Sequence, residues 1–116
     1  MPKRILSKNK ILYSGLYEKM PINDLILIGM SSIQEENEKC SFEKIIGKCF
    51  IFFPKVFGFC QYPKWPDSRK LDRPLRELRE KRLITGNPKT YFSLTKEGNK
   101  LANDIAKDFW QKKLIL

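Results

Sequence analysis

The chain has 116 residues, of which 41% are hydrophobic and 31% charged, which suffices for one compact core and excludes a disordered polar chain. Lys and Arg number 23 against 13 Asp and Glu, so the formal net charge is +10 and polyanions are the natural partners. The sequence has no histidine, no C-x-x-C pair and no phosphate-cradling glycine motif, which argues against an enzyme, a metal site or a cofactor.

Cysteine usage and hydropathy bear on the compartment. Cys40, Cys49 and Cys60 lie among apolar neighbours, so we expect three buried free thiols in a reducing, cytoplasmic compartment. The longest apolar stretch, residues 49–60, is shorter than the about 20 residues needed to span a bilayer. We therefore expect neither a transmembrane segment nor a membrane partner.

Two regions are expected along the chain: a basic N-terminal arm over residues 1–21 and a domain over residues 22–116. The boundary is placed at Pro21 because the residue before a proline avoids helical backbone angles. Asn23 then precedes apolar residues at helical spacing, so we expect it to cap a first core helix. The polar residues 34–39 are expected to form a loop after that helix.

A second helix is predicted over residues 42–53, where apolar residues keep the helical period after Ser41 and before Pro54. The segment is also rich in β-branched and aromatic residues, so a strand is the alternative. Charged residues on one narrow face favour the helix. Residues 54–66 form an aromatic-rich connector, whose bulky groups we expect to pack at the edge of the core.

A third helix, predicted over residues 67–82, places leucines and arginines on opposite faces at about 100° per residue. The leucines are Leu71, Leu75 and Leu78, and the arginines are Arg69, Arg73 and Arg76. Pro74 lies within this helix, and proline is comfortable only in a first turn. Either Asp72 is the true N-cap, after a turn begun by Asp67, or the helix is kinked.

The pattern after Arg82 changes to that of a hairpin and a last helix. Residues 83–85 and 90–94 are the predicted strands, and residues 86–89 are the turn. Thr95 is expected to cap a final helix. Its apolar stripe comprises Leu101, Ala102, Ile105, Ala106, Phe109 and Trp110. In one alternative this helix packs on the core. In the other, residues 95–116 pair two copies of the chain in a homodimer, because Trp110, Leu114 and Ile115 exceed the needs of a small core.

This order of elements resembles a winged helix-turn-helix domain. The segment RPLRELREKRLI (73–84) looks like a recognition helix running into a wing strand. The segment YFSLTKEGNKLA (91–102) looks like the second wing strand running into a capped helix with a small residue in its first turn. The resemblance implies a mainly α fold with a small β-hairpin (α+β), namely a three-helix bundle, a two-stranded wing and a C-terminal helix. The chain departs from the pattern at Arg82, where many such domains have glycine, and a left-handed arginine costs about 1 kcal/mol.

The resemblance also implies a function, because in such domains the third helix lies in the major groove and the wing contacts the adjacent backbone or minor groove. Double-stranded DNA is then the partner of a transcriptional regulator or of a DNA-targeting domain in a larger system. The implied contacts are Arg69, Arg73 and Arg76 to guanines or phosphates, Lys64, Ser68 and Lys70 to phosphates, and Asn87, Lys89 and Thr90 of the wing to phosphates. The alternatives are RNA binding and a protein-interaction scaffold, for which Tyr62 and Trp65 of the connector offer a docking surface.

Overall fold

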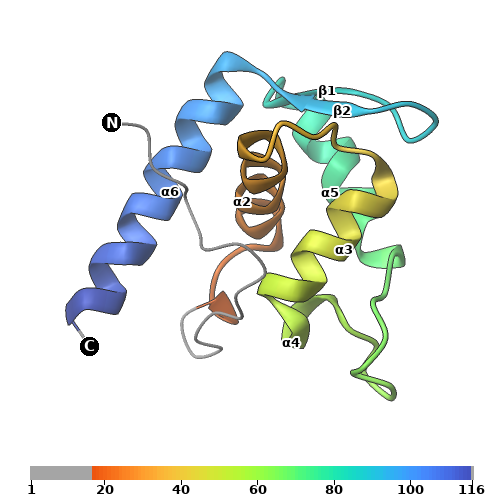
Figure 1. Ribbon diagram of the computed structural model, residues 1–116, viewed down its shortest axis with the longest axis vertical. Helices are drawn as coiled ribbons and strands as arrows, with labels where there is room; N and C mark the ends of the chain where they lie inside the picture. Colours follow the sequence, from red (N-terminus) through yellow and green to blue (C-terminus); the bar gives the residue numbers. More distant parts are fainter. Residues whose placement is uncertain (1–16, 116) are drawn as a thin grey trace.

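The computed structural model describes the backbone of residues 17–115 and the side chains of residues 17–108. Within this range, helices surround a central helix and a two-stranded antiparallel sheet lies at one end (Figure 1). In chain order the elements are α2 (Ile22–Glu35), α3 (Phe42–Phe52), α4 (Pro54–Phe57), α5 (Arg69–Glu80), β1 (Ile84–Gly86), β2 (Phe92–Leu94) and α6 (Lys96–Ile115). The predicted mainly helical α+β class is confirmed.

Most of the predicted N-terminal arm lies outside the described residues, but its end is part of the packed structure. Tyr17 is buried, and its ring meets that of Phe53 edge-on with 5.1 Å between the ring centroids. The hydroxyl of Tyr17 accepts a hydrogen bond from the backbone N–H of Lys55 (3.2 Å). Tyr17, within the predicted arm, therefore packs on the folded unit.

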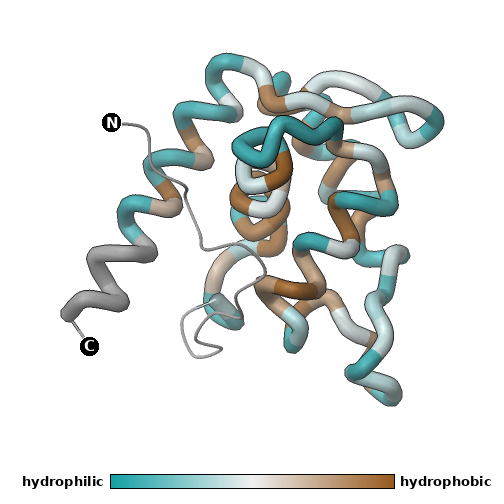
Figure 2. The backbone as a smooth tube through the Cα atoms, in the orientation of Figure 1, coloured by the Kyte–Doolittle hydropathy of each residue, from teal (hydrophilic) through white to brown (hydrophobic). Residues whose placement is uncertain are grey.

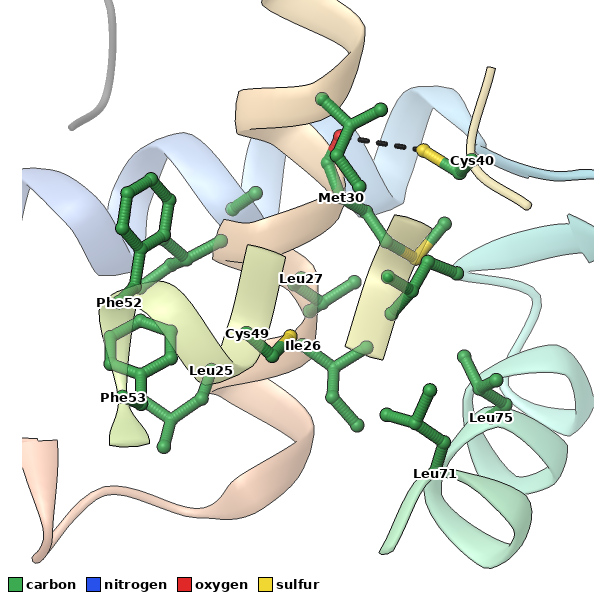
Figure 3. Close-up of a cluster of buried hydrophobic side chains, with 14 of the residues drawn as sticks. Leu25, Ile26, Leu27, Met30, Cys40, Cys49, Phe52, Phe53, Leu71 and Leu75 are labelled. Carbon is green, nitrogen blue, oxygen red and sulfur yellow. Dashed lines mark hydrogen bonds between the residues drawn. The ribbon is translucent and has the colours of Figure 1, made fainter. Parts of the chain in front are cut away.

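Helix α2 forms the centre of the molecule, with α6 on one side and α3 and α5 on the other (Figure 1). Its residues from Leu25 to Ile33 are all buried, as expected for a helix surrounded by other helices. Figure 3 shows its side chains in one buried cluster with Phe52 of α3 and Leu71 of α5. In Figure 2 the most hydrophobic stretches accordingly lie along α2 and α3, whereas the hairpin loop is hydrophilic.

Glycine at position 29 lets α2 and α3 approach closely, because a β carbon there would lie 2.8 Å from Sγ of Cys49. Cys49 and Cys40 are buried, and the Cys40 thiol donates to the carbonyl of Met30 (3.6 Å, Figure 3). Burial raises the pKa of Cys40 to about 12 and also raises the pKa of Cys49. The prediction of three buried thiols is wrong for Cys60, which is exposed on the connector.

Side-chain caps begin two of the helices, and the one at Thr95 was predicted. Oγ of Ser41 accepts from the N–H of Lys44 (3.1 Å) at the start of α3, and Oγ1 of Thr95 accepts from the N–H of Gly98 (3.1 Å) in α6. The Asn23 cap is wrong, because α2 begins at Ile22 and Pro21 occupies the N-cap position. The Asn23 side-chain amide lies within the helix and donates to Oε1 of Glu77 (3.3 Å), which joins α2 to α5.

The predicted second helix is confirmed and its strand alternative is wrong, since α3 covers Phe42–Phe52. The connector that follows contains the short helix α4, which the sequence analysis did not predict. Its Phe57 is buried, as expected of a group that packs at the core's edge. The same expectation is wrong for Tyr62 and Trp65, whose exposed fractions are 64% and 63%.

Helix α5 ends in a Schellman motif with an arginine in the left-handed position. Arg82 has φ of 60°, its N–H bonds to the carbonyl of Arg79 (3.0 Å), and the N–H of Leu83 bonds to that of Leu78 (3.0 Å). The missing glycine therefore does not change how the helix ends. Helix α2 ends in the same way, with Asn37 at φ of 61°.

The hairpin pairs Ile84 with Leu94 and Gly86 with Phe92, and its loop covers residues 87–91. The prediction placed the turn at 86–89, which begins one residue and ends two residues too early. Gly86 has φ of 109°, and a β carbon there would lie 2.0 Å from the carbonyl oxygen of Tyr91, so only glycine fits.

The hairpin is also fastened to the rest of the fold, which the sequence analysis did not predict. The N–H of Phe92 bonds to the carbonyl of Cys40 (2.8 Å), so residue 40 forms a bridge to β2. The N–H of Leu94 bonds to Oε1 of Gln34 at the end of α2 (3.0 Å). These bonds fix the hairpin beside the helices.

Helix α6 packs on α2 through the buried residues Ala102 and Ala106, so the core-packing alternative is confirmed for the described turns. Gly98 in its first turn is required by close approach, because a β carbon would lie 1.9 Å from the carbonyl oxygen of Leu83. The side chains of Phe109, Trp110, Leu114 and Ile115 lie outside the described residues, so the homodimer stays a prediction. No described helix combines the length and the apolarity needed to cross a bilayer.

Candidate nucleic-acid interface

Helix α5 has one apolar face in the core and one basic face in solvent, as predicted. Its three leucines, Leu71, Leu75 and Leu78, are at most 3% exposed. Pro74 is also buried, and the helix runs continuously through it from Arg69. The proposed N-cap at Asp72 is therefore wrong, since Asp72 lies in the first turns of the helix.

Arg69 does not project freely, because it is paired to the acid before it. Its Nε and Nη2 donate to the two carboxylate oxygens of Asp67 at 2.9 and 3.0 Å, and its guanidinium lies 5.0 Å from the ring centroid of Phe59. Asp67 is buried, and these hydrogen bonds lower its pKa below the usual carboxyl value. A groove contact by Arg69 would have to break this pair.

Lys70 is also engaged within the chain. Its ammonium donates to the carbonyl of Val56 (2.6 Å) and to that of Gly58 (3.3 Å), which fastens the connector to α5. Lys70 thus bonds to carbonyls of its own chain, and the predicted contact with a phosphate would compete with these bonds. Ser68 is exposed at the N-cap position without a side-chain capping bond, and Lys64 is exposed near the tip of the connector.

Arg73 and Arg76 project into solvent from the basic face. Nε of Arg73 lies 3.7 Å from Oε2 of Glu77, but both side chains are exposed, so the attraction is weak. Arg76 is also exposed, and no ion pair joins it to an acidic residue of the described part. These two guanidinium groups are available to an anion.

Arg79 is a further cation of this surface that the sequence analysis missed. It donates from Nη1 to the carbonyl of Gly86 (3.0 Å), which ties α5 to the hairpin. Residues three apart in a helix lie on neighbouring parts of its surface, so the spacing from Arg76 could have predicted that Arg79 lies near it. An open hollow of 130 Å³ between α5 and the hairpin is lined by Phe42, Asp72, Leu75, Arg76, Arg79, Pro88 and Phe92.

The hairpin loop carries the predicted wing residues in two different roles. Oδ1 of Asn87 accepts from the N–H groups of Lys89 (2.9 Å) and Thr90 (3.2 Å), so Asn87 shapes the turn. Lys89 and Thr90 are exposed at the tip. The structure thus presents one ammonium and one hydroxyl on a turn with fixed backbone geometry.

The hairpin loop and the connector lie at opposite ends of α5 and project on the same side of the molecule (Figure 1). Helix α6 lies on the other side of α2 from this surface. The described residues contain no cluster of His, Cys, Asp or Glu side chains placed to hold a metal ion. No protein-family model matches the chain, and no curated protein or solved structure is significantly similar to it.

Proposed function

We propose that the chain is a winged helix-turn-helix domain that binds double-stranded DNA, with α5 in the major groove and the hairpin loop on the adjacent backbone. The observation that carries this proposal is the solvent-exposed pair Arg73 and Arg76, which lies opposite the buried leucines of α5. Arg76 also lines the hollow between α5 and the hairpin. The net charge of +10 supports a polyanionic partner.

Helix α5 has the shape and chemistry that major-groove binding needs. The major groove is about 12 Å wide and admits an α-helix. Arginine's planar fork binds guanine or a phosphate through two hydrogen bonds. Because Leu71, Leu75 and Leu78 anchor the opposite face, the helix cannot rotate to bury its arginines.

The proposed wing contact requires a hairpin that is fixed relative to α5. The bond from Arg79 to Gly86 joins it to α5, and the bridge between Cys40 and Phe92 joins it to the segment before α3. Lys89 and Thr90 at its tip carry groups that bind phosphate without reading bases. The wing is therefore expected to add affinity more than sequence preference.

The test is fluorescence anisotropy with a labelled random-sequence DNA duplex at low salt. The double variant Arg73→Glu/Arg76→Glu should weaken binding at least about thirtyfold, since each groove arginine contributes about 1–3 kcal/mol. The matched control is Lys100→Glu/Lys107→Glu, which changes the net charge equally on exposed positions of α6. Equal losses of affinity in both double variants would show that binding is only non-specific charge attraction. Unchanged affinity in Arg73→Glu/Arg76→Glu would show that the interface lies elsewhere.

Competition with an RNA duplex of equal length separates DNA from RNA. A-form RNA has a deep and narrow major groove that a helix cannot enter. Unlabelled DNA should therefore displace the labelled duplex at a lower concentration than RNA does. The reverse order would favour RNA as the natural partner.

A further inference from the structure

The connector between α4 and α5 is a closed loop with its own hydrogen bonds. Phe59 donates its N–H to the carbonyl of Trp65 (3.0 Å), and Trp65 donates to that of Tyr62 (3.0 Å). Gly58 and Pro66 form a bridge across the base of the loop. Together with the side-chain bonds of Arg69 and Lys70 described above, these contacts hold the loop in one position on α5.

This rigid loop displays two large aromatic side chains to solvent. The rings of Tyr62 and Trp65 stack with 5.6 Å between centroids and 22° between planes, and each side chain is more than half exposed. Every described phenylalanine, by contrast, is buried or half-buried. Aromatic groups held apart from the core on a fixed loop are typical of a surface that contacts a partner.

The charge of the loop fits a phosphate backbone. Lys64 lies between the two aromatic residues in sequence and is exposed, and Asp67, the loop's acid, is already paired with Arg69. The indole N–H of tryptophan and the hydroxyl of tyrosine can both donate to phosphate oxygens while the rings pack on sugar carbons. The loop therefore offers a cation, two donors and an apolar surface in one place.

The position of the loop relative to α5 indicates which part of the DNA it would meet. Helix α5 has 12 residues, so it is about 18 Å long, whereas the major groove is about 12 Å wide. A helix lying across the groove brings each of its ends against one of the two backbones. The hairpin follows the C-terminal end of α5, and the connector precedes the N-terminal end.

We propose that the connector is a second DNA-contacting wing, in which Tyr62 and Trp65 pack on the deoxyribose of the backbone beside the N-terminal end of α5 and Lys64 pairs with a phosphate. This inference rests on the proposed function, because it requires α5 to lie in the groove. It assigns the aromatic pair to DNA rather than to a protein partner.

An NMR titration of the ¹⁵N-labelled chain with a short random-sequence DNA duplex tests it. Resonances of α5, of the hairpin loop and of the connector, including the Trp65 indole N–H, should shift together, whereas exposed positions of α6 should not. Shifts in α5 and the hairpin without shifts in the connector would overturn the inference and leave the aromatic pair for a protein partner. If α5 itself does not respond, the proposed function fails.

Variants give a second, independent measurement. Tyr62→Ala/Trp65→Ala should weaken duplex binding about tenfold with an unchanged melting temperature, because both side chains are exposed in the free protein. Lys64→Gln should make the slope of log affinity against log salt less negative by about 0.9, whereas Lys107→Gln on α6 should leave it unchanged. Affinity within about twofold of wild type for the aromatic double variant would contradict the inference.

Discussion

At the scale of single residues, Arg82 adopts a backbone conformation that suits glycine. Its φ of 60° brings Cβ close to the carbonyl oxygen, at a cost of about 1–2 kcal/mol for a residue with a side chain. Three hydrogen bonds hold Arg82 in this backbone conformation. These are the two Schellman hydrogen bonds and the bond from the Thr95 hydroxyl to the Arg82 carbonyl (2.8 Å).

Replacing Arg82 with glycine should therefore stabilise the fold. We expect Arg82→Gly to raise the free energy of unfolding by about 1 kcal/mol in chemical denaturation, because glycine removes the clash. Lys81→Gly is the control, since Lys81 has φ of −80° and gains only flexibility, so that variant should be less stable. Destabilisation of both variants would show that the strain at Arg82 is negligible.

Local signals predicted much at this scale, and tertiary contacts account for the errors. Ser41 and Thr95 act within one helical turn, so their capping roles could be predicted from neighbouring residues. The hydrogen bonds of Lys70 could not be predicted in this way, because their acceptors are carbonyls 12 and 14 residues earlier in the chain. Arg69 was correctly predicted on the solvent face of α5. Its ion pair with Asp67 could not be predicted, because the position of Asp67 depends on the path of the connector.

At the scale of elements, the connector depends on the ion pair between Asp67 and Arg69. The hydrogen bonds from Arg69 lower the folded-state pKa of Asp67 below the ordinary carboxyl value of about 4. A depressed folded-state pKa stabilises the fold at pH values above the ordinary value. That contribution is lost as the pH falls through the lowered pKa.

Removing the arginine should consequently raise the pKa of Asp67. An NMR titration of the carboxyl carbon should place the wild-type pKa below about 4. Arg69→Gln should move the pKa upward, because the hydrogen bonds and the charge of the guanidinium, which lower it, are lost. Asp67→Asn should remove this part of the acid dependence of unfolding. An unchanged pKa in Arg69→Gln would show that the pair does not form in solution.

The elements that sequence periodicity defines were predicted best. Helices α2, α3, α5 and α6 follow their apolar spacing, whereas α4 has too few residues to show a period. The first strand ends one residue later than predicted, because Gly86 belongs to β1 rather than to the turn. The bridge between Cys40 and Phe92 joins residues 52 apart in sequence and leaves no local pattern. The segment around Cys40 was therefore predicted as an ordinary loop.

At the scale of the whole molecule, the net charge of +10 predicts a strong dependence of binding on salt. If about four to six cations of α5, the connector and the hairpin loop neutralise phosphates, log affinity should fall with log salt at a slope of about −3.6 to −5.4. Anisotropy measured across a series of salt concentrations gives this slope. A slope near zero would contradict DNA binding through this surface.

The hairpin has only three residues in each strand, and an isolated two-stranded ribbon of that length is marginal in water. Its order comes from Gln34, from the bridge at Cys40 and from the Thr95 hydroxyl that bonds to the carbonyl of Leu83. We therefore expect the hairpin to unfold together with the helices in one cooperative transition. A substitution that unfolds the helices should therefore also disorder the hairpin, even where the residues at the hairpin tip are unchanged.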